Sequence, residues 1–156
     1  MVSVNDAASY VFKTYKEQTG RSIDEMKLHK LLYFAQRESL IRTGQPLFDA
    51  TFYGWKYGPI LKEVREMFHY TGFENQISDA AVAELKPVMD VVFSNYAQKD
   101  SWSLSRLTHG ERSWQKSREG VLESDNSDNP MSLEDIRNDA QRIKERRALL
   151  GEIGLL

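Results

Sequence analysis

The sequence predicts a mainly α-helical fold: a compact single-domain helical bundle of about six to seven helices with one small β-strand or hairpin element. Several segments carry apolar residues at helical spacing behind N-capping residues, whereas one short stretch alternates as a strand does. The length of 156 residues is typical of one domain, and 40% apolar residues suffice for a core. We therefore expect a single domain over residues 1–156.

The first helix is expected from Val4 to Thr19. Ser3 and Asp6 have the spacing of a capping box, and Gly20 supplies a left-handed stop. The predicted buried stripe of this helix comprises Ala8, Val11, Phe12 and Tyr15.

The second helix is expected to begin after a capping box of Ser22 and Glu25 and to end at Gly44. Its apolar residues cover more than one face, which indicates a central helix that is buried on several sides. Its basic residues are expected to extend along the exposed face and keep their charged heads in water: Lys27, Lys30, Arg37 and Arg42.

The segment Thr51–Lys56 is the one convincing strand, because aromatic residues alternate along it. Its predicted aromatic face comprises Tyr53 and Trp55, followed by Tyr57. Ile77 is a candidate partner for the residues around Phe52 in a small hairpin.

Two prolines set the expected boundaries of the middle helices. Pro59 suits the first position of a helix that runs to about Tyr70 and ends at Gly72, and Pro87 should divide the next helical region in two. The remaining helices are expected over 79–85, 87–97, 101–108, 113–118 and 132–150, with Ser101 and Ser132 as caps and a loop over 119–130.

The residues supply no set of catalytic or metal-binding groups. The chain has no cysteine, and its three histidines share no metal-ligand spacing. His109-Gly110-Glu111 has the spacing of zinc deaminases, but that site also needs two cysteines. The sequence contains no phosphate-binding loop and no nucleophile elbow. We expect no enzyme activity, no catalytic residue, no metal and no cofactor.

Charge and hydropathy point to a cytoplasmic protein. The N-terminus lacks the pattern of a signal peptide, and no apolar run approaches the ~18 residues of a spanning helix. The net charge of −2 gives no global attraction to nucleic acid or to anionic lipid. We expect neither a membrane nor nucleic acid as a partner.

The turn from Trp55 to Pro59 has two interpretations. In the first, Trp55 is a core residue and Gly58 permits a tight turn before Pro59. In the second, the aromatic ribbon lines the rim of a partner-binding groove, since tyrosine and tryptophan are good interface anchors. Both can hold, with Trp55 inside and Tyr57 at the surface.

The segment from Thr108 to Trp114 also has a structural and a functional interpretation. The Thr108 hydroxyl and the Glu111 carboxylate can cap free N–H groups where two helices meet, and the Trp114 indole can enter the core with its N–H bonded to a carbonyl. Alternatively, His109 and its neighbours form a polar corner that contacts a partner.

The C-terminal helix and apolar tail, residues 132–156, leave two alternatives open. The later half of the helix is basic over Arg142–Arg147, so the chain could be a nucleic-acid-binding accessory or regulatory protein. The apolar residues over Leu149–Leu156 either pack onto the domain or stay exposed as a contact site for a partner or a protease.

The chain resembles the Panacea domain of SocA-like antitoxins over residues 22–114. Ser113 departs from that pattern, which usually has proline before the tryptophan. The matching residues are Lys27, Leu28, Lys30, Leu31, Leu32, Tyr33, Phe34, Ala35, Pro46, Leu47, Phe48, Trp55, Tyr57, Gly58, Pro59, Thr108, His109, Glu111 and Trp114.

The resemblance implies a phage-associated antitoxin that neutralises a toxin protein by direct contact, the toxin being commonly encoded by the neighbouring gene. One branch of the family instead delivers its toxin to the ClpXP protease. On this basis we expect partner contacts at Lys56, Tyr57, His109 and Glu111. The residues expected to support that surface are Trp55, Gly58, Pro59, Thr108 and Trp114.

Overall fold

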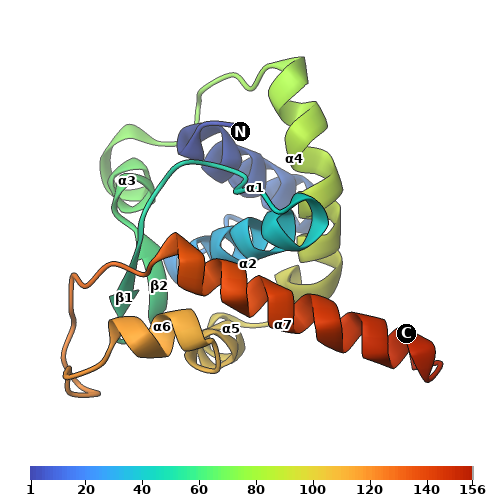
Figure 1. The fold of residues 1–156 in the computed structure, drawn as a ribbon. Helices are drawn as coiled ribbons and strands as arrows, with labels where there is room; N and C mark the ends of the chain where they lie inside the picture. Colours follow the sequence, from blue (N-terminus) through green and yellow to red (C-terminus); the bar gives the residue numbers. More distant parts are fainter. Residues whose placement is uncertain (156) are drawn as a thin grey trace.

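The computed structural model describes residues 1–155 and has the mainly helical fold that the sequence predicts (Figure 1). Within those residues it contains seven α-helices, two π-helical turns and one antiparallel pair of strands. The helices are α1 (Val4–Thr19), α2 (Glu25–Thr43), α3 (Lys62–Glu66), α4 (Asp79–Val92), α5 (Ser101–His109), α6 (Arg112–Ser117) and α7 (Leu133–Glu152). The π-helical turns are η1 (Met67–Thr71) and η2 (Phe93–Ala97), and the strands are β1 (Phe52–Trp55) and β2 (Gly58–Leu61).

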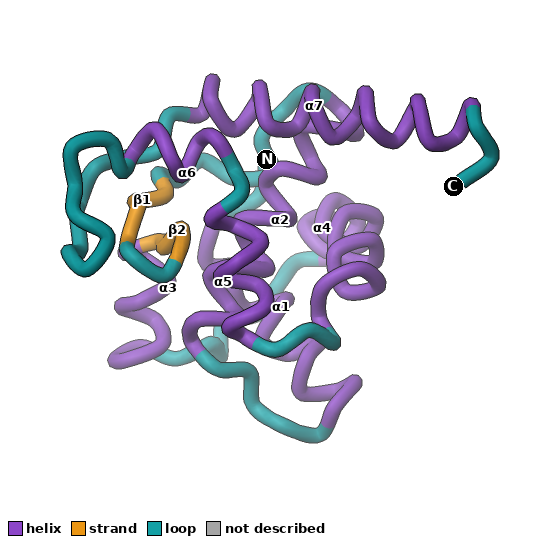
Figure 2. The backbone as a smooth tube through the Cα atoms, turned by 90° about the horizontal axis from the view of Figure 1, so that it is seen from below, coloured by secondary structure: helices purple, strands orange, loops and turns teal. Residues whose placement is uncertain are grey.

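Helix α2 is the centre of the fold, as its apolar pattern predicts. It packs against α1, α4, α5, α7 and β2, and these elements surround it in both views (Figures 1 and 2). Leu28, Leu31 and Leu32 are fully buried on it. Helix α2 therefore positions these five elements relative to one another, because each of them packs on it.

Three of the four basic side chains of α2 are buried, so the prediction that they reach water is wrong for them. Lys27 donates to the Ala97 carbonyl at 3.0 Å, and Lys30 donates to the Pro59 carbonyl at 3.3 Å. Arg37, which is 4% exposed, pairs with the carboxylate of Glu111, between α5 and α6. Arg42 is exposed as predicted. The acceptors come from distant segments, so local spacing gives no sign of them.

Helix caps follow the predicted chemistry, with two changes of residue. Ser3 and Ser132 accept hydrogen bonds from the third residue of their helices, as predicted. Helix α2 is capped by Asp24, not Ser22, and α5 is capped by Asp100, not Ser101. In both cases an aspartate lies next to the predicted residue or close to it and places its oxygen on the N–H groups of the first turn.

The strands β1 and β2 form a hairpin, so the predicted helix start at Pro59 is wrong. Trp55 pairs with Gly58 and Gly54 pairs with Pro59, which leaves a two-residue turn. Gly58 has φ +114°, a conformation outside the helical region. A two-stranded sheet tolerates Pro59 because each strand is an edge.

The helix after the hairpin is correspondingly shorter than predicted. Helix α3 begins at Lys62, continues through η1 and ends at Gly72, which has φ +76°. The proposed pairing of Ile77 with the residues around Phe52 is also wrong, because β2 occupies that place.

Helix α4 runs without interruption through Pro87, so the predicted division into two helices is wrong. Proline removes one backbone hydrogen bond, to the carbonyl four residues earlier, which is that of Ala83. Pro87 and Ala83 both lie on the exposed face, so water can satisfy that carbonyl. The opposite face buries Leu85 and Met89, and this burial offsets the cost of the proline.

Helix α7 crosses the bundle and projects past it. Its first half packs on α2 and α6, whereas its C-terminal end stands clear of the other helices (Figures 1 and 2). Leu149, Ile153 and Leu155 are 57%, 60% and 69% exposed, so the described part of the tail does not pack on the domain. Leu156 lies outside the described residues. Among residues 1–155, no helix is both long enough and apolar enough to cross a membrane.

Candidate functional site

The hairpin turn, the corner between α5 and α6 and the loop that follows α6 line a hollow of about 530 Å³. Three of the residues predicted to contact a partner line it together: Lys56, Tyr57 and His109. Trp114, predicted as a supporting residue, forms another wall. The fold therefore joins the two sequence motifs into one surface.

Trp114 ties this surface together. Its indole N–H donates to the Trp55 carbonyl at 2.8 Å, which confirms the predicted bond to a carbonyl. Its ring stacks on the His109 imidazole with centroids 4.1 Å apart. Trp55 itself is half-buried, with the Arg65 guanidinium over its ring at 5.1 Å. Trp55 therefore supports the surface both through its backbone carbonyl, which accepts from Trp114, and through its ring, which contacts Arg65.

The exposed part of the surface is aromatic. Tyr57 is 45% exposed and Trp102, on α5, is 55% exposed, and their rings meet edge to face at 5.2 Å. The Lys56 ammonium lies 5.1 Å from the Tyr57 ring. Ser105 holds the turn in place by donating to the Tyr57 carbonyl at 2.7 Å. Sequence reasoning missed Trp102, although it lies on the helix face opposite the buried Leu104.

His109 is the last residue of α5 and is half-buried. Burial lowers the pKa of its imidazole, so the ring is mostly neutral at pH 7. Its Nε2 lies 3.5 Å from the Ser105 hydroxyl, so the ring is held in place on one side while it stacks on the indole.

Close packing fixes the base of the turn. A Cβ atom at Gly58 would lie 2.5 Å from Thr108 Oγ1 and 2.7 Å from Lys30 Cε. The Thr108 hydroxyl donates to the Ser105 carbonyl at 2.7 Å, so it does not cap a helix as predicted. Pro59 is buried in the strand.

Glu111 lies apart from the hollow. It is the N-cap residue of α6, but its side chain makes no capping bond and instead forms an ion pair with Arg37. It lines a different cavity, between α6 and α7. The structure thus separates Glu111 from the other three predicted contact residues, and its predicted capping role is wrong.

A partly buried charge cluster centred on Glu25 lies beneath the other side of the hairpin. Glu25 accepts from His29 at 3.0 Å, from His69 at 2.7 Å and from Arg65 at 2.8 Å. Burial would raise the pKa of Glu25, but these donors lower it to about 2. Sequence spacing gave no sign that two histidines share this carboxylate. Among residues 1–155, no group of three or more acidic or histidine side chains is arranged to hold a metal ion.

Two buried basic residues, His29 in this cluster and Lys30 beside it, have their protonation set by their surroundings. His29 Nδ1 accepts from the Leu61 N–H at 3.2 Å, so Nε2 carries the proton that Glu25 accepts. Burial lowers the pKa of Lys30 to about 7. Lys30, Trp55 and Tyr57 line a smaller hollow of about 290 Å³ on this side of the turn.

Comparison with known proteins connects this geometry to a family. Residues 28–115, from α2 through the hairpin to α6, match the family described as antitoxin SocA-like, Panacea domain. The chain belongs to the SocA-like Panacea family. This confirms the resemblance predicted from the motifs, and the matched range contains every predicted contact and supporting residue.

One curated relative of this Panacea protein is Antitoxin SocA of Caulobacter vibrioides (strain NA1000 / CB15N). The two are 31% identical over 78 residues, which is 50% of this chain and 42% of that protein. The chain therefore spans less than half of the relative that it matches. No solved structure matches the chain significantly. Helices α1 and α7 lie outside the Panacea match.

Proposed function

We propose that this protein is an antitoxin that neutralises a toxin protein by binding it directly. Membership of the SocA-like Panacea family supports the antitoxin role. The proposed contact surface is the hollow between the hairpin turn and the α5–α6 corner. A single observation carries it: Lys56, Tyr57 and His109, from two separate motifs, line one hollow.

The physical character of this surface suits protein binding. Tyr57 and Trp102 are exposed aromatic residues, and binding energy in interfaces concentrates in a few such anchors. The backbone of the hairpin turn is held by hydrogen bonds from Ser105 to the Tyr57 carbonyl and from Trp114 to the Trp55 carbonyl, so the turn has little order to gain on binding. Glu111 contributes indirectly, since its ion pair with Arg37 holds the start of α6 against α2.

Two assays test this proposal, with the toxin taken as the product of the neighbouring reading frame. Co-expression measures protection of cells, and a titration measures binding of the purified toxin. Tyr57→Ala and His109→Ala should each weaken purified toxin binding by on the order of thirtyfold, which corresponds to ~2 kcal/mol. Tyr70→Ala is the matched control, because Tyr70 is 85% exposed and lies on η1, away from the hollow. All three variants should melt within a few degrees of the wild type.

Two outcomes would contradict the proposal. If the wild-type protein neither binds the toxin nor protects cells, the antitoxin role is wrong. If it binds and the Tyr57 and His109 variants bind equally well, the surface is wrong. The toxin level after translation is stopped separates the two modes of action: a stable toxin indicates occlusion, and a fall that depends on a ClpXP-type protease indicates delivery.

A further inference from the structure

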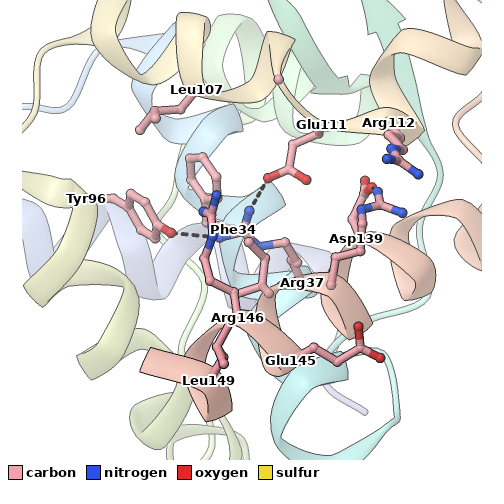
Figure 3. A pocket seen from close by; sticks show the side chains of 13 residues that line it. Phe34, Arg37, Tyr96, Leu107, Glu111, Arg112, Asp139, Glu145, Arg146 and Leu149 are labelled. Carbon is pink, nitrogen blue, oxygen red and sulfur yellow. Dashed lines mark hydrogen bonds and ion pairs between the residues drawn. The ribbon is translucent and has the colours of Figure 1, made fainter. Parts of the chain in front are cut away.

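A second cavity, of about 720 Å³, lies on the other side of the α5–α6 corner, under the projecting part of α7 (Figure 3). Phe34, Arg37 and Tyr96 line it from α2 and η2. The rings of Phe34 and Tyr96 stack with centroids 4.1 Å apart, and the Arg37 guanidinium lies 4.9 Å from the Phe34 ring. We call this cavity the α7 groove.

Arg37 places an incompletely used donor in the wall of the α7 groove. Its Nη2 donates to the Tyr96 hydroxyl at 2.7 Å, and its Nη1 pairs with Glu111 (Figure 3). Its Nε–H is buried and has no acceptor among residues 1–155. Because Glu111 and Tyr96 engage both Nη groups, the Arg37 guanidinium is fixed in the wall of the groove.

The charges that line the α7 groove leave an excess of arginine. The lining contains four arginines against three carboxylates: Arg37, Arg112, Arg142 and Arg146 against Glu111, Asp139 and Glu145. Two ion pairs, Arg37–Glu111 and Arg142–Asp139, neutralise the inner part. Arg112 and Arg146 are exposed and form no ion pair within residues 1–155. Glu145 is exposed beside them, and two arginines against one carboxylate leave the open rim with a net positive charge.

Apolar side chains line the same rim. Leu107 is 44% exposed and Leu149 is 57% exposed, and they come from α5 and α7. Ile153 follows Leu149 by four residues, so the apolar stripe continues along the projecting end of α7, where no other helix covers it (Figures 1 and 2). An elongated apolar stripe bordered by arginines suits a peptide segment better than a compact small molecule.

We propose that the α7 groove receives a segment of the toxin that carries carboxylates among apolar side chains. Leu107 and Leu149 contact the apolar side chains, while Arg112 and Arg146 pair with the carboxylates. This inference rests on the proposed function and extends it. His109 lines the hollow on one side of the corner, and Gly110 and Glu111 line the α7 groove on the other, so one partner can contact both sites.

The alternatives are less well matched to the α7 groove. A nucleic-acid backbone could pair with the same arginines, but it would leave the exposed leucines of the lining without an apolar partner. A basic peptide would be repelled by the excess of arginines in the lining. Of these three ligands, only the acidic, apolar segment both pairs with the arginines and covers the exposed leucines.

Matched substitutions on α7 test this assignment. Arg146→Glu and Leu149→Asp should each weaken binding of the purified toxin by about tenfold or more. Lys144→Glu and Leu133→Asp are the controls, because both residues are exposed on the same helix outside the groove lining. The controls should stay within about twofold of the wild type, and all four variants should keep its melting temperature.

A photo-crosslinking amino acid at Leu107 tests the chemistry of the occupant in the purified complex. Mass spectrometry should identify a crosslinked toxin peptide that contains aspartate or glutamate beside apolar residues. A basic peptide, or a peptide of a second copy of this chain, would overturn the inference, as would groove variants that bind like their controls while Tyr57→Ala does not. Failure of the wild-type protein to bind the toxin would overturn the proposed function and this inference together.

Discussion

The His109 imidazole lies flat on the Trp114 indole, with ring centroids 4.1 Å apart and planes inclined by 10°. The same indole donates to the Trp55 carbonyl, so one side chain connects the end of α5, the start of α6 and the hairpin. The shape of the candidate surface therefore depends on Trp114, whereas contact with a partner depends on its exposed neighbours.

We expect one tryptophan substitution to act mainly on stability and another to act mainly on toxin binding. Trp114→Ala should lower the free energy of unfolding by ~3 kcal/mol, because it removes a half-buried ring and its hydrogen bond. Trp102→Ala should cost less than ~1 kcal/mol, because the ring is 55% exposed, but it should weaken toxin binding. Urea denaturation and a binding titration of each variant check this. Equal loss of stability in both would contradict the division of roles.

A second prediction concerns the base of the hairpin turn. Gly58→Ala should destabilise the protein by ~2 kcal/mol or more, because φ is +114° and the new Cβ would lie 2.5 Å from Thr108 Oγ1. Gly20→Ala is the matched control: φ is +72° there, but nothing lies within 4 Å of the added Cβ. It should cost only about 1 kcal/mol. Thermal denaturation of the two variants compares strain alone with strain plus steric overlap.

The parts of the fold that depend on local chemistry were predictable from sequence. Helix α1 and the start of α7 match their predictions because Ser3 and Ser132 cap the turns beside them. Strand β2 could not be predicted from the sequence, because Gly58-Pro59 is as typical of a helix start as of a turn. Only the pairing of Gly58 with Trp55 selects the strand. Similarly, Pro87 suggests a break in the helix. Helix α4 tolerates it because the residue lies on the exposed face, which the sequence does not show.

The candidate site was predictable in part for the same reason. The two motifs identified Lys56, Tyr57 and His109, and the fold brings these together. The burial of Lys30 and Arg37 could not be predicted from the sequence of α2, because the groups that cover them come from the hairpin and from the α5–α6 corner. A helical pattern shows which residues share a face, but not which face a distant segment will cover.

Lys30 should make stability rise with pH between neutral and alkaline conditions. Burial lowers its pKa from 10.5 to about 7 in the folded protein. Below pH 7 both states carry the charge and the folded state bears the full desolvation penalty. Between pH 7 and 10.5 the unfolded state binds more protons, so the penalty is progressively relieved.

We therefore expect Lys30→Met to stabilise the protein at pH 6 by on the order of a few kcal/mol, with an advantage that shrinks as pH rises to 10. Urea denaturation of both proteins at several pH values gives the difference directly. An advantage that does not change with pH would mean that Lys30 is charged throughout this range when folded. Lys16→Met, on the exposed part of α1, is the control and should show no such trend.

Glu25 should also make stability rise with pH, but in the acid range. Its folded pKa is lowered from 4.5 to about 2, so the carboxylate stabilises the fold above pH 4.5, and this stabilisation is lost as pH falls toward 2. We expect Glu25→Gln to cost on the order of 2–3 kcal/mol at pH 7. The cost should decrease steadily as the pH is lowered from 5 to 2.

The partners of Glu25 provide a second check on the same cluster. His69 is exposed and Arg65 is exposed, whereas His29 is buried and also accepts from Leu61. His69→Ala should therefore remove only part of the stabilisation, and His29→Ala should remove more, because it also leaves a buried N–H unpaired. Glu17→Gln, an exposed change on α1, should leave the pH profile unchanged. If Glu25→Gln behaves like Glu17→Gln, the cluster does not lower the pKa of the Glu25 carboxylate and does not stabilise the fold through its charge.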